Sequence, residues 1–151
     1  MIAALVALLL AQSPAPPAVA WTLRAPEARA GETLELTLSA VIAPGWHLYA
    51  MTQPEGGPVP TEFSVPAGQP VRFAKPVIAS KPATIHDPNF DLRIQLYSGT
   101  ATFRLPVRVD PSTPAGPQTV VVHARYQSCN DVLCLPPRTV PIETTLIVRS
   151  R

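Results

Sequence analysis

Hydrophobic and polar residues alternate along several short segments of this chain. In Thr33–Ile42 every second residue from Leu34 to Ile42 is apolar, and Ala101–Asp110 repeats the pattern. A period of two residues is typical of a β-strand with one buried face and one exposed face. We therefore predict a strand in each segment, with alternate side chains in the core.

Similar runs predict five more strands, separated by turns rich in proline and glycine. They are Trp46–Ala50, Thr61–Val65, Pro70–Ile78, Gln118–Gln127 and Thr139–Arg149. No segment has the 3.6-residue period of a helix, and 20 prolines favour short strands over long helices. These seven segments and their spacing indicate about eight or nine short strands in all, which predicts an all-β fold, an immunoglobulin-like antiparallel β-sandwich. A small barrel is the competing architecture, but the inward faces fit a two-sheet core better.

Pro106 and Pro141 fall inside predicted strands, so their missing N–H groups should point to a sheet edge or to solvent.

Composition limits the class of protein. The chain has 151 residues, of which 46% are apolar and 15% are charged, with a net charge of +2. This suits one domain with a hydrophobic core. The 12 basic residues are spread singly, without a cluster and without interleaved aromatic residues. The sequence therefore predicts no nucleic-acid partner.

The N-terminus has the outline of an export signal. Ile2–Ala11 is an apolar run too short to span a bilayer, and Ala18-Val19-Ala20 is a candidate cleavage site. We expect residues 1–20 to be a signal peptide and residues 21–151 to form one periplasmic or otherwise exported domain, with no integral membrane segment after cleavage. No Lys or Arg precedes the apolar run, so a misassigned start codon or an uncleaved anchor stays open.

The two cysteines are predicted to face each other across a hairpin. Cys129 and Cys134 lie between the last two predicted strands, with Asn130 and Asp131 as turn residues. Opposed residues of an antiparallel pair have Cα atoms roughly 4.5–5.5 Å apart, which permits a disulfide. So short a loop stabilises a fold by only about 2 kcal/mol, less than a bridge between distant strands. The residues alone leave open whether the bond is reactive or structural.

Three motifs resemble one known family. The segment Tyr126-Gln-x-Cys129-Asn-Asp-x-x-Cys134-Leu-Pro-Pro137 resembles the active-site hairpin of the N-terminal periplasmic domain of the thiol:disulfide interchange protein DsbD. Gly45–Tyr49 is similar to that family's aromatic strand, and His86–Phe90 followed by Tyr97 is similar to its cap loop. The resemblance covers essentially the whole chain after residue 20.

The resemblance implies a periplasmic immunoglobulin-like domain for thiol–disulfide interchange, a protein-disulfide reductase component without a cofactor. Its expected donor is a membrane-linked, thioredoxin-like protein, and its expected acceptors are disulfide isomerases or thioredoxins of cytochrome c maturation. By resemblance, Cys134 forms the mixed disulfide with partners and Cys129 resolves it. The donor must be a separate protein, because no thioredoxin-like or electron-conducting domain occurs in this sequence.

The resemblance also implies a set of residues around the cysteines. Phe90 is the expected cap that covers the pair and moves on docking. The other implied site residues lie in the cap loop, the aromatic strand and the hairpin flanks: Asp87, Asn89, Trp46, Tyr49, Tyr126 and Pro136. A role as ordinary core aromatics stays open for Trp46 and Tyr49. Two departures from the family are a cysteine interval one residue shorter, and Pro88 and Asn89 where the family has carboxylates.

Two other functions compete with exchange. One is an exported protein-binding module with a structural disulfide. The other is a metal site made by the cysteines with His47, His86 and His123, but these histidines lie on separate predicted elements without ligand spacing. We therefore predict no metal. No nucleophile motif with a nearby base indicates a hydrolase.

Overall fold

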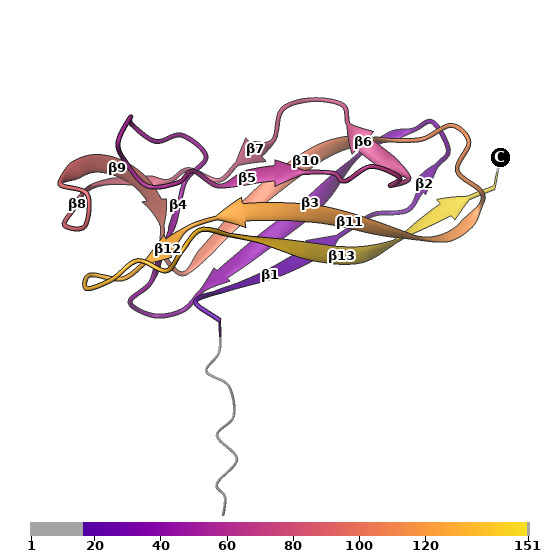
Figure 1. Ribbon diagram of the computed structural model, residues 1–151. Helices are drawn as coiled ribbons and strands as arrows, with labels where there is room; N and C mark the ends of the chain where they lie inside the picture. Colours follow the sequence, from indigo (N-terminus) through magenta and orange to yellow (C-terminus); the bar gives the residue numbers. More distant parts are fainter. Residues whose placement is uncertain (1–16, 151) are drawn as a thin grey trace, which may run out of the picture.

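The computed structural model describes residues 17–150, which form strands and loops with no helix. Figure 1 shows the long strands running side by side, with a smaller group of strands at one end. In chain order the strands are β1 (Val19–Arg24), β2 (Ala28–Arg29), β3 (Thr33–Ile42), β4 (His47–Tyr49), β5 (Glu62–Ser64), β6 (Val71–Phe73), β7 (Ile78–Ala79), β8 (Ala83–Asp87), β9 (Leu92–Tyr97), β10 (Thr100–Val109), β11 (Gly116–Tyr126), β12 (Ser128–Cys129) and β13 (Arg138–Arg149).

Two sheets form the sandwich. One has the order β1-β3-β10-β6, with β7 also paired to β10, and the other has the order β2-β13-β11-β5. All pairs are antiparallel except β2 with β13. Most of the alternating residues predicted to face inward, such as Leu36, Leu105 and Val122, are buried in one continuous core, whereas Leu34 and Val140 are only partly buried. The predicted immunoglobulin-like β-sandwich is confirmed.

The second of these sheets determines where the cysteines lie. The ladder between β11 and β13 runs without interruption from Gly116 opposite Val148 to Tyr126 opposite Arg138. The chain that connects these two strands is the hairpin that carries the cysteines. The longest ladder of the second sheet therefore supports the base of this hairpin.

A third sheet was not predicted. It has the order β12-β4-β9-β8 and lies at the end of the sandwich where the hairpin projects (Figure 1). Residues Leu92, Ile94 and Leu96 of β9 alternate with polar residues, so the strand had a period-2 signal. Its partner β8 is mostly exposed and has no comparable pattern. A second, smaller core cluster lies on this sheet.

The segment Pro70–Ile78, predicted as one strand, forms two. β6 and β7 both pair with β10 and are separated by residues 74–77. Pro106 explains the break: its carbonyl accepts a 2.9 Å bond from the N–H of Ala74. Because N–H and C=O of a strand residue point to the same side, the missing N–H of Pro106 faces this interruption. Pro141 lies opposite His123 of β11 and has no strand partner on its other side among the described residues, so this part of β13 is a sheet edge.

The described residues include only the end of the predicted signal peptide. Residues 1–16, which hold most of the predicted signal peptide, lie outside the described residues. The expected cleavage point after Ala20 falls inside β1, where Val19 pairs with Ile42 and Ala20 with Val41. Within residues 17–150 there is no helix of the length and apolarity needed to span a membrane.

Candidate functional site

A disulfide joins Cys129 and Cys134 near the tip of the hairpin. The two residues face each other as an antiparallel bridge, with Cα atoms 4.0 Å apart. This is closer than the 4.5–5.5 Å that we expected for opposed strand residues. Cys129 belongs to β12 and pairs with His47 of β4, so one cysteine is fixed in the third sheet.

The turn between the cysteines is held by the side chain of Asn130. Its Oδ1 accepts hydrogen bonds from the backbone N–H groups of Val132 (2.9 Å) and Leu133 (2.8 Å). The N–H of Asn130 in turn donates to the carbonyl of Leu133 at 2.9 Å. An asparagine side chain satisfies turn donors in this way better than most residues, which gives the tip a defined conformation.

The two sulfur-bearing residues differ in accessibility. Cys129 is 0% exposed, whereas Cys134 is partly exposed. Thiol–disulfide exchange requires a thiolate to approach a sulfur along an open path. An incoming group therefore meets Cys134 first, and the accessible disulfide expected from the sequence is accessible on one side.

A small apolar cluster packs around the disulfide. It consists of Tyr49, Ile94, Leu96 and Cys129, and each of these is at most 3% exposed. Phe90 and Cys134 both pack against this cluster. Phe90 contacts the ring of Tyr49 edge to face, with centroids 5.8 Å apart. The expected cap residue thus lies over the same cluster as the disulfide.

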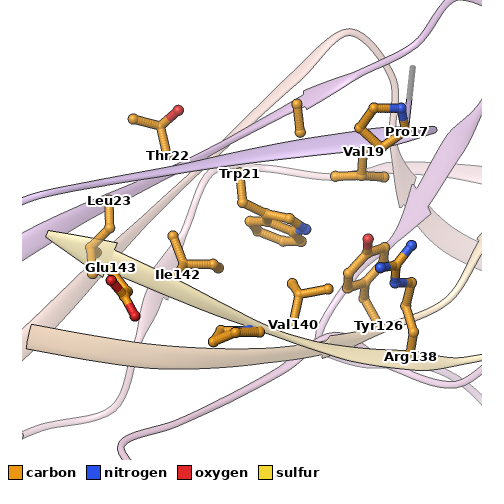
Figure 2. Close-up of a pocket in the computed structure, with 12 residues that line it drawn as sticks. Pro17, Val19, Trp21, Thr22, Leu23, Tyr126, Arg138, Val140, Ile142 and Glu143 are labelled. Carbon is orange, nitrogen blue, oxygen red and sulfur yellow. The ribbon is translucent and has the colours of Figure 1, made fainter. Parts of the chain in front are cut away.

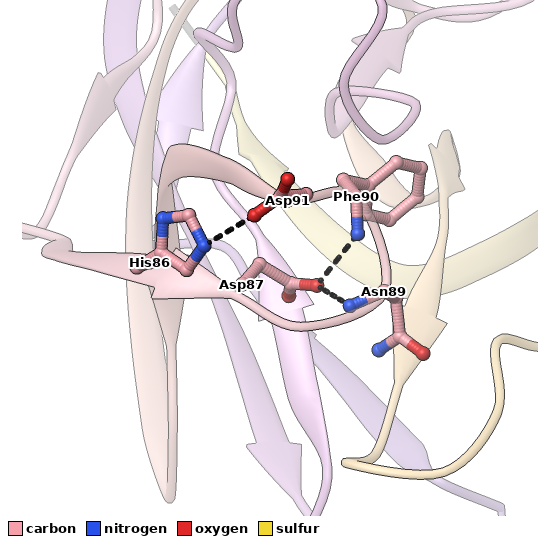
Figure 3. A network of polar contacts seen from close by, with 5 residues as sticks. All are labelled: His86, Asp87, Asn89, Phe90 and Asp91. Atoms are coloured by element: carbon pink, nitrogen blue, oxygen red, sulfur yellow. Dashed lines mark hydrogen bonds and ion pairs between the residues drawn. The ribbon is translucent and has the colours of Figure 1, made fainter.

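Asp87 organises the loop that carries Phe90. Its carboxylate is 1% exposed, and Oδ1 accepts bonds from the backbone N–H groups of Asn89 (2.7 Å) and Phe90 (3.3 Å). Figure 3 shows both bonds converging on the carboxylate. Oδ2 accepts a 2.8 Å bond from the hydroxyl of Tyr49. A buried carboxylate is tolerated only when it is hydrogen-bonded in this way.

The bond between Tyr49 and Asp87 also affects ionisation. Burial, and then the hydrogen bond and charge of Asp87, raise the pKa of the Tyr49 phenol well above its usual value near 10. Tyr49 stays neutral at any physiological pH and keeps its proton for donation to Asp87. The phenol therefore acts as a fixed link between β4 and the cap loop.

Asn89 connects the cap loop directly to the hairpin. Its Nδ2 donates a 3.0 Å hydrogen bond to the backbone carbonyl of Asn130. At the other end of the loop, His86 Nε2 lies 2.8 Å from Asp91 Oδ1, an exposed contact also visible in Figure 3. Asp91 has a φ of 54°, a left-handed conformation that aspartate adopts more readily than most residues. A hydrogen bond between a side chain and a backbone carbonyl therefore joins this loop to the hairpin that carries the cysteines.

Not all of the site residues implied by the resemblance come together. Tyr49 and Phe90 lie in the same cluster as the disulfide, Asp87 is hydrogen-bonded to Tyr49, and Asn89 is hydrogen-bonded to the hairpin. Trp46 and Tyr126 pack instead against the main sandwich core. Trp46 therefore lies where the alternative of an ordinary core aromatic residue would place it. Pro136 is exposed beyond the hairpin.

The sequence did not single out Ile94 and Leu96 of this site, and it indicated Asn130 as a turn residue without a contact to the β8–β9 loop. The alternation of Leu92, Ile94 and Leu96 was a usable signal for the two apolar ones. The contact between Asn89 and Asn130 spans 41 positions and has no local signal.

The rim of the hairpin is apolar. Val132 is 83% exposed, Leu133 is 46% exposed and Leu135 is 36% exposed. Three large apolar side chains beside the disulfide form a small surface that water solvates poorly. Among residues 17–150, no group of three or more His, Cys, Asp or Glu side chains is arranged to hold a metal ion.

Comparison with known proteins gives one family and a consistent fold. Residues 11–146 match the sequence model described as "Thiol:disulfide interchange protein DsbD, N-terminal". The solved N-terminal domain of Neisseria meningitidis DsbD, in the reduced form, aligns with a TM-score of 0.57 and 18% identity over 86% of each chain. The N-terminal periplasmic domain of ScsB from Proteus mirabilis aligns with a TM-score of 0.54 and 19% identity, covering 83% of this chain and 44% of that one. No curated protein matches the chain. At these identities the structural matches establish the fold.

Proposed function

This chain belongs to the family of the N-terminal domain of the thiol:disulfide interchange protein DsbD, and from that premise we propose that Cys129 and Cys134 relay electrons from a thioredoxin-like donor to oxidised partner proteins. Membership confirms the resemblance seen in the hairpin, strand and loop motifs. Together with the Cys129–Cys134 disulfide it identifies a thiol–disulfide exchange domain. The direction of transfer and the partners are the proposal.

The exchange proceeds in two steps. The Cys134 thiolate attacks the partner disulfide, a bond forms between Cys134 Sγ and one partner sulfur, and the other partner sulfur leaves as a thiolate. The Cys129 thiolate then attacks Cys134 Sγ, which closes the disulfide and releases the second partner thiolate. The partner gains two electrons and takes up two protons from solvent. A reduced thioredoxin-like donor restores the dithiol by the same steps in reverse.

The difference in exposure between the cysteines is the observation that carries this assignment. A partner sulfur must reach the attacking residue, and Cys134 is the one that is partly exposed. The resolving residue needs to reach only Cys134, and Cys129 is buried directly opposite it. Phe90 packs on the same cluster, which supports a cap that shields the pair until a partner displaces it. Asp87 and Tyr49 position this cap.

A trapping experiment tests the roles. The variant C129S keeps Cys134 free and should accumulate a mixed disulfide with thioredoxin-like proteins of the same compartment, detected on non-reducing gels and identified by mass spectrometry. The variant C134S is the matched control and should trap far less, because its remaining thiol is buried. Trapping by C134S alone would reverse the assignment, and trapping by neither variant would reject the relay.

The reduction potential separates exchange from a structural disulfide. A bond that serves only as a crosslink is expected below about −300 mV, whereas an exchange-competent bond lies higher. We expect the Cys129–Cys134 couple above that value, measured by equilibration with glutathione or dithiothreitol buffers. A lower value would favour the binding module with a structural disulfide.

Export to the periplasm is part of the same proposal. A disulfide that persists in the folded domain is typical of an oxidising compartment, and residues 1–20 contain the apolar run and the Ala-Val-Ala site of an export signal. The mature domain would begin at Trp21 and keep the pairs from Trp21 to Arg24 of β1. Intact mass measurement of the exported protein checks this: a mass that includes residues 1–20 would reject cleavage after Ala20.

A further inference from the structure

A groove lies on the side of the sandwich, between the edge strands of its two sheets. Its walls are Val19–Leu23 of β1 on one side, of which cleavage after Ala20 would keep Trp21–Leu23, and Arg138, Val140 and Ile142 of β13 on the other, with Tyr126 at one end. We call it the seam groove. Its volume is about 530 Å³, within the roughly 300–1,000 Å³ range of small-molecule sites. None of the groups that surround the disulfide lines it.

The floor of the seam groove contains a hydrogen-bond donor without a partner. Trp21 Nε1 is shielded from water and makes no hydrogen bond within residues 17–150. The indole ring packs against Tyr126, with centroids 5.3 Å apart, and against Phe63 and Phe103 of the core. Figure 2 shows its nitrogen directed toward the end of the groove where Val19, Tyr126 and Arg138 lie. Buried polar groups are nearly always paired, so an unpaired one indicates a missing acceptor.

The charge at this end of the groove favours an anion. Arg138 is exposed and lines the groove, and its guanidinium offers several donors and no acceptor. The indole N–H also only donates. The one acidic side chain of the lining, Glu143, lies five residues further along β13, which is roughly 16 Å at 3.3 Å per residue. Figure 2 places Glu143 and Arg138 at opposite ends.

We propose that the seam groove binds a small organic monocarboxylate. The carboxylate would accept hydrogen bonds from Arg138 and from the indole N–H of Trp21. The apolar part of the ligand would lie along Val140 and Ile142, whose side chains face the groove. Because the indole N–H is shielded from water, binding requires a neighbouring side chain to move, and Arg138 is the long, exposed one at this end. The site is separate from the disulfide and does not depend on the proposed relay.

The test uses nuclear magnetic resonance of the ¹⁵N-labelled protein with 4-phenylbutyrate as the probe. Resonance assignment distinguishes the indole N–H of Trp21 from that of Trp46. We expect a saturable downfield shift of the Trp21 signal, with a Kd below about 1 mM. The neutral analogue 4-phenylbutan-1-ol has the same apolar group and should bind at least about tenfold more weakly.

Two variants locate the carboxylate. R138Q removes the charge at a similar side-chain length and should weaken phenylbutyrate binding about tenfold or more. R125Q is the matched control, because Arg125 is exposed on the neighbouring β11 and does not line the groove; it should bind as the unsubstituted protein does. The proposal is overturned by the absence of a saturable Trp21 shift, by equal binding of the alcohol, or by equal weakening in R125Q.

Discussion

The carboxylate of Asp87 accepts hydrogen bonds from a strand on one side and from its own loop on the other. Tyr49 Oη approaches Oδ2, and the N–H groups of Asn89 and Phe90 approach Oδ1. Bonds to a charged, buried group are worth more than neutral surface ones, about 1.5–3 kcal/mol each. At the scale of single residues, this carboxylate fixes the backbone of the loop that carries Phe90.

The stability of the protein should fall in alkaline solution because of Tyr49. Its folded-state pKa is raised above the unfolded value near 10, so the neutral phenol stabilises the fold below pH 10. That contribution is lost as the pH rises beyond it. Y49F should be less stable than the unsubstituted protein by roughly 1–3 kcal/mol at neutral pH. The gap should narrow above about pH 10 in urea unfolding series, and a gap that stays constant across that range would contradict the assignment.

Removing the ring of Phe90 should expose the disulfide. We expect F90A to react with dithiothreitol at least about threefold faster than the unsubstituted protein, because Cys134 loses its apolar cover. The rate is followed by thiol alkylation and mass spectrometry. F73A is the control, since Phe73 is a partly buried phenylalanine that packs on the main core far from the disulfide in sequence and sheet. An unchanged rate in F90A, or equal acceleration in F73A, would exclude shielding by Phe90.

The β8–β9 loop and the cysteine hairpin are held together by the bond from Asn89 to the carbonyl of Asn130. The contact depends on both elements, because Asp87 fixes the conformation of the loop and Asn130 Oδ1 fixes the conformation of the turn. β12 fixes Cys129 in the third sheet, while Cys134 lies in the returning segment outside the named strands. At the scale of elements, the hairpin and the cap loop form one closed unit.

Replacing the donor of Asn89 should loosen the cap without unfolding the protein. N89D has nearly the same shape, but its carboxylate cannot donate to the Asn130 carbonyl. We expect faster reduction of the disulfide by dithiothreitol, and a change in unfolding free energy within about 0.5 kcal/mol because the side chain is exposed. The control N130A removes the turn acceptor but keeps the backbone carbonyl that Asn89 binds. If N89D reacts at the unsubstituted rate, the bond does not hold the cap.

At the scale of the whole molecule, we expect the sandwich to fold without the disulfide. The main core draws on both sheets, from Leu36 and Phe103 to Val122 and Leu146, and excludes the cysteines. The disulfide belongs to the smaller cluster at one end, and it closes a loop with a sequence separation of 5. A domain that cycles between dithiol and disulfide must stay folded in both states, and this separation of cores permits it.

Loss of the disulfide should therefore have a modest effect on stability. The double variant C129A/C134A should lose about 2–3 kcal/mol, from the small entropy of a short loop and a minor packing loss. That corresponds to a fall of roughly 4–12 °C in Tm for a chain of this size. Circular dichroism should show an unchanged strand spectrum at room temperature. Unfolding of the double variant at that temperature would show that the bond is structural.

The sequence by itself determined the strands that alternate, the side of each that is buried, and the hairpin that brings the cysteines together. These follow from a period of two residues and from turn chemistry, which act over a few neighbouring positions. Local pattern also showed its limit: Pro70–Ile78 was predicted as one strand, but Pro106 on a distant strand interrupts it.

Only the tertiary structure decided which cysteine is buried, which aromatic residues adjoin the disulfide and what holds the cap. Tyr49 meets Asp87 across 38 positions, and Asn89 meets Asn130 across 41. The third sheet that creates these contacts pairs short strands whose order depends on packing against the end of the sandwich. Contacts between distant segments are properties of the whole chain, and no local pattern encodes them.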